Sequence, residues 1–384
     1  MKIPFNKPFI SGKELQYISE AVGLGKLSGD GFFTKSCHQF FREKFGFENC
    51  LLTTSCTDAL EMAAILLNIQ PGDEVIMPAY TFVSTANAFV LRGAKIVFAD
   101  SRKDHPGMDE SIVESLITSK TKAIVVVHYA GVAVDMDIIM QLSKKFGVYV
   151  VEDAAQAIDS YYKGKPLGSI GHLAAFSFHE TKNIQSGEGG MLVINDDTFV
   201  QRAEIIREKG TNRTSFFRGE VNKYGWVDIG SSFLPSEITA AFLYGQLENI
   251  ETIQAKRKTI WNYYNNIFLH QEKLSLSLPV IPDYATSNGH MYYLICNDHQ
   301  ERQFIIESLK NAGIYAVFHY QSLHKSEYYY EKYEGKELVQ SDYFTDRLLR
   351  LPLYFELSEA EVEEIAETVI QSMIQYRQMH MIHK

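Results

Sequence analysis

Cysteine is scarce in this sequence, and its spacing matches no common metal-binding pattern. The chain contains Cys37, Cys50, Cys56 and Cys296, and no two of them form a CxxC pair. We therefore expect free thiols rather than a disulfide framework or a zinc site, and we expect no metal ion in the protein.

Positive charge and long apolar runs are also in short supply. The 37 Lys and Arg against 47 Asp and Glu give a formal net charge of −10, so neither nucleic acid nor an anionic membrane surface is an expected partner. No segment approaches the roughly 20 apolar residues that cross a bilayer. The longest run, 123–134, is interrupted by His128 and Gly131. The N-terminus lacks the apolar stretch of a secretory signal, and we expect a cytoplasmic protein.

Short β-branched runs alternate with amphipathic stretches over the first two-thirds of the chain. The expected strands are 74–77, 94–99, 122–127, 147–153, 174–178 and 190–194, with helices over 109–117 and 137–145. This alternation is typical of an α/β fold with a mostly parallel sheet covered on both faces. Ligands of such sheets bind beyond the carboxyl ends of the strands.

The pattern changes near residue 235. A helical stretch over 235–265, broken near Asn249, precedes a smaller α/β pattern with strand 291–296, helix 300–312 and strand 315–318. A terminal helix is expected over 359–377. We therefore predict a large domain over residues 1–245, with a short N-terminal arm, and a small C-terminal α/β domain over 246–384.

Lys182 lies in a loop that follows the expected strand 174–178 and precedes the glycine-rich residues 187–190. A lysine in such a loop can reach into a cleft, where its amine can form an imine with an aldehyde. By composition alone, a solvated lysine is the plainer interpretation.

Asp153 favours the catalytic interpretation of Lys182, because Asp153 ends a strand at the edge of the sheet where the ligand is expected. Pyridoxal 5′-phosphate (PLP) accepts electrons while its ring nitrogen stays protonated, and a facing carboxylate keeps it so. Asp153 is a candidate for that carboxylate, and Gln156 is placed to hydrogen-bond the ring hydroxyl. The alternative role for Asp153 is an N-cap of a helix over 154–156.

Ser55 and Asp58 have the spacing of a capping box ahead of an apolar run. A helix N-terminus carries free N–H groups and a positive potential, so it is a natural seat for phosphate. Ser177 can add a hydroxyl to the same anion. Phe82 follows another strand end and can stack on a ring, although a place in the core is the plainer role for one of 24 phenylalanines.

Five stretches carry a family resemblance: 55–60 (SCTDAL), 71–75 (PGDEV), 81–85 (TFVST), 151–156 (VEDAAQ) and 177–183 (SFHETKN). In this order they resemble the sugar-nucleotide aminotransferases of the DegT/DnrJ/EryC1/StrS family, and the resemblance runs over essentially the whole chain. It implies the fold type I PLP-dependent aminotransferase architecture and PLP as the cofactor.

The resemblance also implies roles for individual residues. Lys182 would be the catalytic lysine that binds PLP covalently, and Asp153 would pair with the pyridine nitrogen. The other implied cofactor contacts are Gln156, Ser177, Phe82, Ser55, Cys56, Thr57 and Ser232. Many members carry asparagine at the place of Ser232, where it reaches the phosphate in the neighbouring subunit, so the serine puts that contact in doubt. Arg213, Tyr224, His319 and Tyr320 are candidate substrate contacts, and a homodimer with active sites at the interface is implied.

Within the family, 82–97, 128–132, 203–213, 228–232 and 316–320 are similar to members that make dTDP-4-amino-4,6-dideoxygalactose. The implied reaction moves an amino group from L-glutamate to C4 of dTDP-4-keto-6-deoxy-D-glucose, with 2-oxoglutarate as the second product. Three alternatives stay open: the gluco-configured 4-amino product, amination of a 3-keto sugar, and a non-catalytic regulatory role. Lys182 argues against a dehydratase, since such relatives carry histidine at that place.

Overall fold

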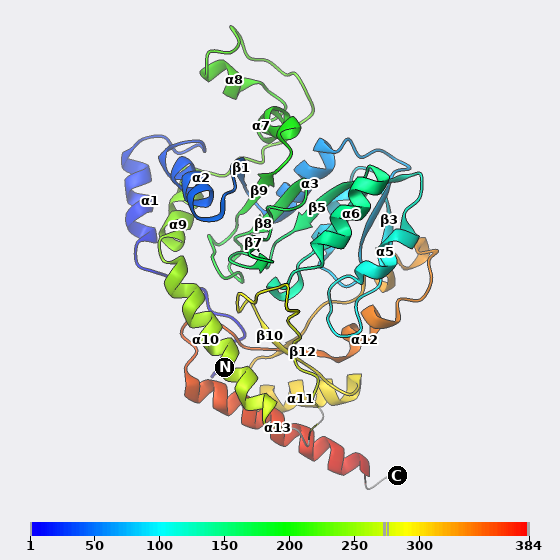
Figure 1. Ribbon diagram of the computed structural model, residues 1–384. Helices are drawn as coiled ribbons and strands as arrows, with labels where there is room; N and C mark the ends of the chain where they lie inside the picture. Colours follow the sequence, from blue (N-terminus) through cyan, green and yellow to red (C-terminus); the bar gives the residue numbers. More distant parts are fainter. Residues whose placement is uncertain (1, 272–273, 275, 382–384) are drawn as a thin grey trace.

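The computed structural model describes residues 2–271, 274 and 276–381 (Figure 1). Its central sheet has the strand order β1-β9-β8-β5-β4-β2-β3. These strands are β1 (Cys50–Thr53), β2 (Glu74–Pro78), β3 (Lys95–Ala99), β4 (Thr121–Val127), β5 (Tyr149–Asp153), β8 (Leu173–Ser177) and β9 (Gly190–Ile194). Within this described sheet only β9 runs against its neighbours, so the sheet is mostly parallel, as expected.

Helices cover both faces of the sheet because alternate strand residues point to opposite sides. In β4, Ile124 and Val126 belong to one core, and Ala123 and Val125 belong to the other. The first core is closed by α2 (Phe32–Phe45), α5 (Glu110–Leu116), α6 (Met136–Phe146) and α9 (Glu237–Leu247), with α1 (Glu14–Gly23) packed on α9. The second is closed by α3 (Cys56–Leu66), α4 (Val83–Val90) and α7 (Val200–Arg207).

A smaller unit lies below the large sheet in Figure 1. Its three-stranded sheet has the order β10-β12-β11, from β10 (Tyr292–Ile295), β11 (Val317–Phe318) and β12 (Leu348–Leu351). Its helices are α10 (Ile250–Leu269), α11 (His299–Asn311), α12 (Val339–Arg347) and α13 (Glu359–Met381). The expected break near Asn249 is present, because α9 ends at Leu247 and α10 begins at Ile250.

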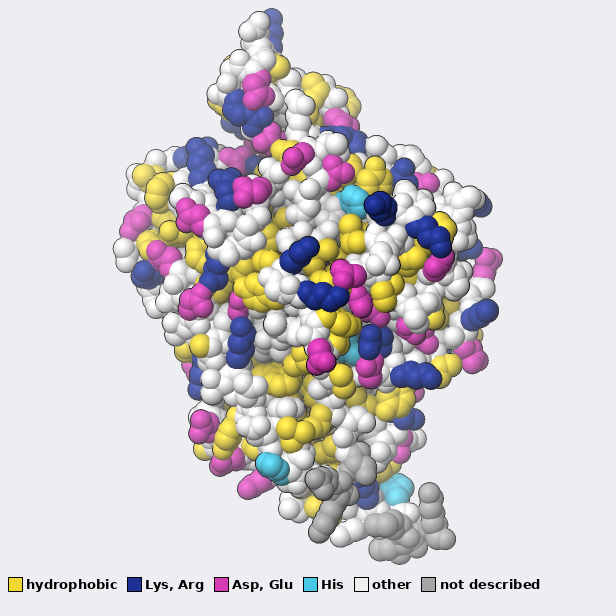
Figure 2. Space-filling view, viewed as in Figure 1, with side chains coloured by type: hydrophobic (Ala, Val, Ile, Leu, Met, Phe, Trp, Pro, Cys, Tyr) yellow, Lys and Arg dark blue, Asp and Glu magenta, His cyan; other side chains and the backbone are white. Residues whose placement is uncertain are grey.

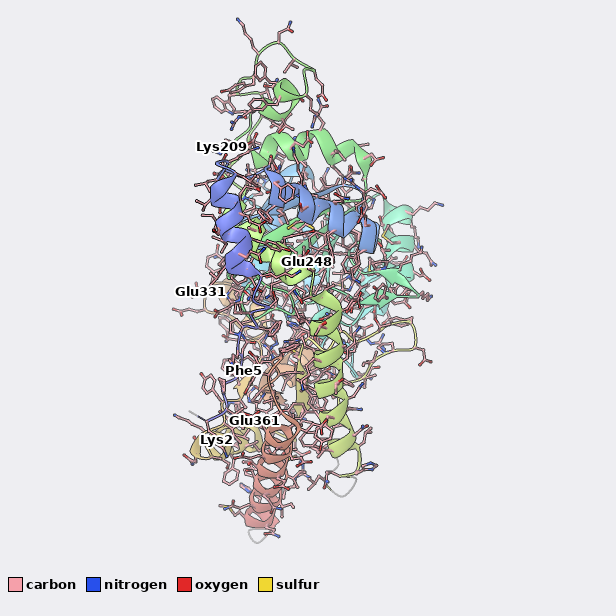
Figure 3. The ribbon with its side chains drawn as sticks, turned by 90° about the vertical axis from the view of Figure 1, so that its left-hand side faces the viewer. Lys2, Phe5, Lys209, Glu248, Glu331 and Glu361 are labelled. Carbon is pink, nitrogen blue, oxygen red and sulfur yellow. The ribbon has the colours of Figure 1, made fainter. Side chains whose placement is uncertain are left out.

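The start of the chain packs on this smaller unit. Ile3 is buried in its core and bridges to Ile314, and Lys2 pairs with Glu364 of α13 at 2.6 Å. Figure 3 shows Lys2 and Phe5 in the same half of the molecule as Glu361 of α13. The domain boundary at residue 245 stays a prediction, and these first residues lie with the smaller unit rather than with the rest of 1–245.

Two short elements complete the chain. A small hairpin is formed by β6 (Tyr161–Tyr162) and β7 (Lys165–Pro166). An arm that contains α8 (Arg213–Phe217) projects from the body at the top of Figure 1. On the face shown in Figure 2, Lys and Arg side chains are interspersed with Asp and Glu. No helix within the described ranges combines the length and apolar character needed to cross a bilayer.

Candidate active site

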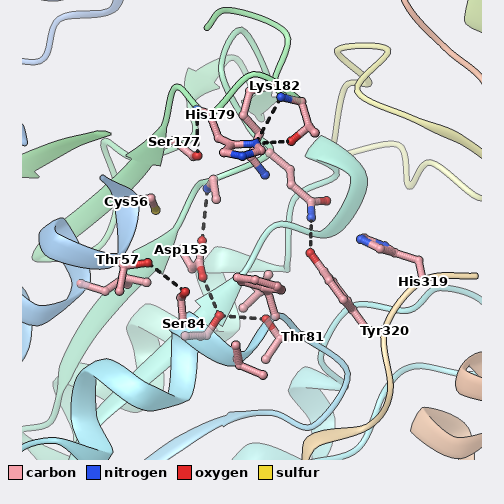
Figure 4. A pocket seen from close by; sticks show the side chains of 18 of the residues that line it. Cys56, Thr57, Thr81, Ser84, Asp153, Ser177, His179, Lys182, His319 and Tyr320 are labelled. Atoms are coloured by element: carbon pink, nitrogen blue, oxygen red, sulfur yellow. Dashed lines mark hydrogen bonds between the residues drawn. The ribbon is translucent and has the colours of Figure 1, made fainter. Parts of the chain in front are cut away.

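A cavity of about 670 Å³ opens at the carboxyl edge of the large sheet (Figure 4). The strand ends Thr53, Gly190 and Ser177 lie side by side there, and Val127 pairs with Asp153 in the neighbouring strands. Most residues predicted from the sequence line this cavity, namely Ser55, Cys56, Thr57, Phe82, Asp153, Gln156, Ser177, Lys182, His319 and Tyr320. Stretches far apart in the chain therefore converge, as the parallel topology requires.

Lys182 is held by a loop with fixed ends. Its backbone N–H donates to the carbonyl of His179 at 2.9 Å, and Asn183 donates to Gln254 at 2.9 Å and to the Asn288 carbonyl at 3.0 Å. Burial lowers the pKa of Lys182, while Cys56 and Asp153 act in the opposite direction. A lysine with a lowered pKa is a better nucleophile and base near neutral pH, because more of it is unprotonated.

Asp153 lies buried at the end of β5 with its carboxylate on the cavity. One oxygen accepts from the Thr85 hydroxyl at 2.7 Å, and the other accepts from the Ala155 amide at 3.2 Å. Burial raises the pKa of Asp153, and the Thr85 and Ala155 hydrogen bonds and the Lys182 charge only partly oppose it. The alternative of a helix N-cap does not hold, since residues 154–157 contain a turn and no helix.

The preceding carboxylate, Glu152, points to the other side of the sheet and is fully satisfied by the protein. It accepts from His128 Nε2 at 2.9 Å and from the amides of Gly168 and Gly171 at 2.7 and 2.6 Å. Burial raises the pKa of Glu152, but these donors outweigh it and the net pKa is lowered. Alternation along one strand thus gives adjacent carboxylates opposite environments: Glu152 is structural, and Asp153 faces the cavity.

The N-terminus of α3 forms a second wall. Ser55 caps the helix by accepting from the Asp58 amide at 3.0 Å, and Thr57 donates to Ser84 at 2.8 Å. The first amides of a helix have no intrahelical acceptor and can bind an anion. Gly190 lets β9 approach this turn closely, since a Cβ there would lie 2.2 Å from the Ser55 carbonyl carbon.

The opposite wall is aromatic. Phe82 is 54% exposed although it lies on the cavity, so one ring face is open to a ligand. Gln156 accepts from the Ala130 amide at 2.6 Å and donates to the Tyr320 hydroxyl at 3.0 Å. Tyr320 has a φ of 35°, a strained conformation for a residue other than glycine, and such strain is common at functional sites. The hydroxyl of Tyr129 lies 2.8 Å from His319 Nδ1.

Three predicted residues lie elsewhere in the described chain. Arg213, in the projecting arm, lies 3.7 Å from Glu208, and the exposed Tyr224 packs on Phe216. Ser232 bridges to Glu208 at the base of the arm. None of the three lines the cavity of the same chain, so their assigned roles stay predictions that require a second subunit.

The cavity is also lined by residues that were not predicted from the sequence, among them Phe5, Thr85, His290 and Arg350. Thr85 belongs to the stretch 81–85 that carries the family resemblance, so its position in the site could have been predicted from the sequence. Arg350 and His290 come from the smaller unit, and no local pattern marks them. Among the described residues, no cluster of three or more His, Cys, Asp or Glu has the arrangement of a metal site.

The cavity fits a flat aldehyde that carries a phosphate. Lys182 provides the amine for the aldehyde, Asp153 the charge for a protonated ring nitrogen, Phe82 an open ring face, and α3 the amides for a phosphate. This donor set, at the edge of such a sheet, defines a PLP-dependent enzyme of fold type I.

Comparison with known proteins gives the family. The DegT/DnrJ/EryC1/StrS aminotransferase family matches residues 8–370. An uncharacterized protein of Methanocaldococcus jannaschii is 32% identical over 375 residues, with 96% of each chain covered. A Streptococcus pneumoniae protein described as a sugar aminotransferase, solved in PMP and PLP forms, is 28% identical. In the PMP form its TM-score is 0.89, with 97% of this chain and 100% of that chain covered.

A third relative is Helicobacter pylori PseC, an aminotransferase involved in the biosynthesis of pseudoaminic acid. It is 26% identical, with a TM-score of 0.87, and the match covers 98% of this chain and all of that one. The chain therefore belongs to the DegT/DnrJ/EryC1/StrS aminotransferase family. It is a PLP-dependent sugar aminotransferase, and the predicted fold class, enzyme class and cofactor are confirmed.

Proposed function

We propose that this enzyme transfers the amino group of L-glutamate to C4 of dTDP-4-keto-6-deoxy-D-glucose, giving dTDP-4-amino-4,6-dideoxy-D-galactose and 2-oxoglutarate. The observation that carries the amino transfer is the convergence of Lys182 and Asp153 on one cavity. The choice of sugar is supported by the stretches 82–97 and 316–320, which are similar to members that make this product.

The chain's own residues account for the proton movements. PLP, when bound, supplies an electron sink that makes the donor's α-proton acidic. The amine of Lys182 would be the base that takes the proton from the donor α-carbon and the acid that delivers a proton to the sugar carbon. Asp153 would hold the ring nitrogen of the cofactor protonated, and Phe82 and the first amides of α3 would hold its ring and its phosphate.

Product analysis tests this proposal. The purified enzyme with PLP, L-glutamate and dTDP-4-keto-6-deoxyglucose is expected to yield one amino sugar, whose NMR coupling constants at C4 are those of an axial amine. Large couplings at C4 would instead identify the gluco product, and an amine at C3 would identify a 3-keto-sugar aminotransferase. Absence of any amine with every keto sugar would favour the regulatory alternative.

We also propose a homodimer in the cytoplasm, with the projecting arm covering the partner's cavity. The arm carries exposed aromatic side chains, including Phe217, Tyr224 and Trp226, and Trp226 is 84% exposed. Apolar surface of this kind is typical of an interface. Such a contact would bring Arg213, Tyr224 and Ser232 to a partner's cavity. The four free cysteines are consistent with a reducing compartment.

Replacing Trp226 with aspartate is expected to weaken the dimer, because a charge would replace an aromatic anchor at its interface. Sedimentation velocity at micromolar concentration measures the effect, and a loss of activity should accompany the shift to monomer. Tyr330→Asp, which alters another exposed aromatic residue (67% exposed) away from the arm, serves as the control. A Trp226→Asp protein that stays dimeric would place the interface elsewhere.

A further inference from the structure

A second, much smaller cavity lies beside the active-site cavity. Its volume is about 10 Å³, which is enough for a single water molecule and for little else. Four of the residues that line it also line the larger cavity, namely Phe5, Thr181, His290 and Arg350. Because the two cavities share these walls, a molecule bound in the small cavity lies next to the chamber in which the amino group is transferred.

His290 presents a hydrogen-bond acceptor to these cavities. Its Nδ1 atom lies 2.8 Å from Asn183 Oδ1. The side-chain nitrogen of Asn183 donates to Gln254 at 2.9 Å and to the Asn288 carbonyl at 3.0 Å. Since these two bonds use both hydrogen atoms of that nitrogen, Asn183 Oδ1 is the acceptor and His290 Nδ1 carries the hydrogen atom. In the neutral ring of His290, Nε2 is therefore the atom with the free lone pair.

The surroundings of His290 keep its ring neutral. The residue is only 5% exposed. Burial lowers its pKa well below the ordinary value, and the charges of Lys182, Arg350 and Arg257 act in the same direction. Nε2 has no hydrogen-bond partner among the described residues, and the ring lines both cavities. A buried acceptor without a donor is costly, so the small cavity favours an occupant that can donate to Nε2.

The charged groups of the small cavity are donors. Arg350 Nε is buried and has no acceptor among the described residues, and the guanidinium carbon lies 4.8 Å from the centre of the Phe5 ring. Arg257 is fixed in the wall by its bonds to the carbonyls of Gly289 and His290 at 3.2 and 2.7 Å. The occupant must therefore accept from arginine and also donate to His290. Water does both, whereas a halide ion cannot donate and would face the lone pair of Nε2.

We propose that the small cavity is a binding site for one ordered water molecule, and that this water is the reactant that releases the 2-oxo acid product. The inference rests on the proposed function, in which the amino donor is an α-amino acid. In the release step the water oxygen bonds to the donor's α-carbon and the bond from that carbon to nitrogen breaks. Both hydrogen atoms of the water end on the nitrogen, which stays on the cofactor. His290 accepts from the water and Arg350 Nε donates to it, so its orientation is fixed beside the reacting carbon.

A high-resolution crystal structure of the cofactor-free wild type tests the binding site itself. We expect one water within hydrogen-bond distance of His290 Nε2 and Arg350 Nε. A second crystal soaked in sodium bromide offers the alternative occupant, because bromide is identified by its anomalous scattering. Bromide in place of the water, or a small cavity without electron density, would overturn the inference.

Two substitutions of His290 test the role of the water. The side-chain nitrogen of asparagine takes the place of Nδ1, so His290→Asn keeps a donor for Asn183 but removes the acceptor for the water. Its single-turnover release of 2-oxoglutarate is expected to slow roughly 10- to 100-fold, because the reacting water is no longer oriented. Exchange of the α-proton of L-glutamate with deuterated solvent consumes no water and should keep its rate. NMR measures the exchange, and an enzyme-coupled assay measures the release.

His290→Gln distinguishes this role from a structural one. The amide of glutamine reaches the place of Nε2, so this variant should recover part of the release rate although Asn183 loses its donor. The reverse order, with His290→Gln slower than His290→Asn, would show that His290 only supports Asn183 and would overturn the proposed role. Equal losses of exchange and release in His290→Asn would also overturn it.

His105→Asn is the matched control. His105 is 4% exposed, its Nδ1 accepts from the Gly107 amide at 2.8 Å, and it lines neither cavity. Its variant should release 2-oxoglutarate as fast as the wild type. A wild-type enzyme that neither exchanges the α-proton of L-glutamate nor releases 2-oxoglutarate would contradict the proposed donor instead, and the crystal structure would still decide whether the small cavity binds water.

Discussion

Replacing Lys182 with alanine is expected to lower kcat by roughly 10⁴-fold or more, because one amine is lost as both the cofactor anchor and the proton carrier. The α3 amides and Asp153 remain, so the variant should still bind PLP without a covalent link. Borohydride reduction followed by peptide mass spectrometry should add the cofactor mass to the Lys182 peptide of the wild type and to no peptide of the variant.

Lys310→Ala is the control for this experiment, since Lys310 is exposed on α11 and away from the cavity. It should keep both the activity and the cofactor adduct. Thermal melting separates a chemical loss from a folding defect, and the Lys182→Ala protein should melt at or above the wild-type temperature without cofactor. The reason is that burial disfavours the charged form of Lys182, as its lowered pKa indicates, and this cost to the stability of the fold is removed with the amine. Turnover near the wild-type rate would remove Lys182 from the chemistry.

Asp153→Asn is expected to lower the activity of the enzyme and to raise the stability of its cofactor-free fold. The amide cannot hold a proton on the ring nitrogen by its charge, so kcat should fall roughly 10²- to 10³-fold. The covalent adduct on Lys182 should persist. Burial raises the pKa of Asp153 above 3.8 in the folded protein, so its ionisation destabilises the fold. That penalty is absent below the unfolded pKa and grows as pH rises toward and through the folded pKa.

The cofactor-free Asp153→Asn protein should therefore melt at a higher temperature than the cofactor-free wild type at neutral pH. The difference should shrink below about pH 4, where the wild-type carboxyl is protonated in both states. Differential scanning calorimetry at both pH values measures it. An asparagine variant that is both fully active and less stable would contradict the role given to this carboxylate. Asp109→Asn, at a half-buried helix cap away from the cavity, controls for the general effect of removing one charge.

The local sequence was sufficient to predict those features in which chemically reactive residues lie at or just after the ends of strands. The runs 122–127 and 190–194 predicted β4 and β9 to within one residue, and the motifs around Asp153 and Lys182 placed both on the cavity. The break between α9 and α10 was also visible. These features depend on residues that are neighbours in the chain or on the rule that parallel strands end at one edge.

Features that depend on distant contacts were missed. The strands β1 and β12 are too short to show an alternation of apolar and polar residues. Each takes its conformation from its partner strands. α1 and α2 were not predicted, although each has a periodic apolar face; neither has a side-chain N-cap that marks where the helix begins. The pairing of Phe5 with Arg350 joins the two ends of the chain, and a single sequence without covariation carries no record of it.

This pairing has a consequence for biosynthesis. As the polypeptide leaves the ribosome, Asp153 and Lys182 emerge before the strand that bears Arg350, and this strand must insert between two strands already made. Since domains generally fold in the order of synthesis, the nascent protein forms its large sheet first and completes the wall of its cavity only after β12 has emerged. A cavity with all of its walls in place, able to hold both cofactor and substrate, therefore requires the smaller unit to have folded onto the large sheet.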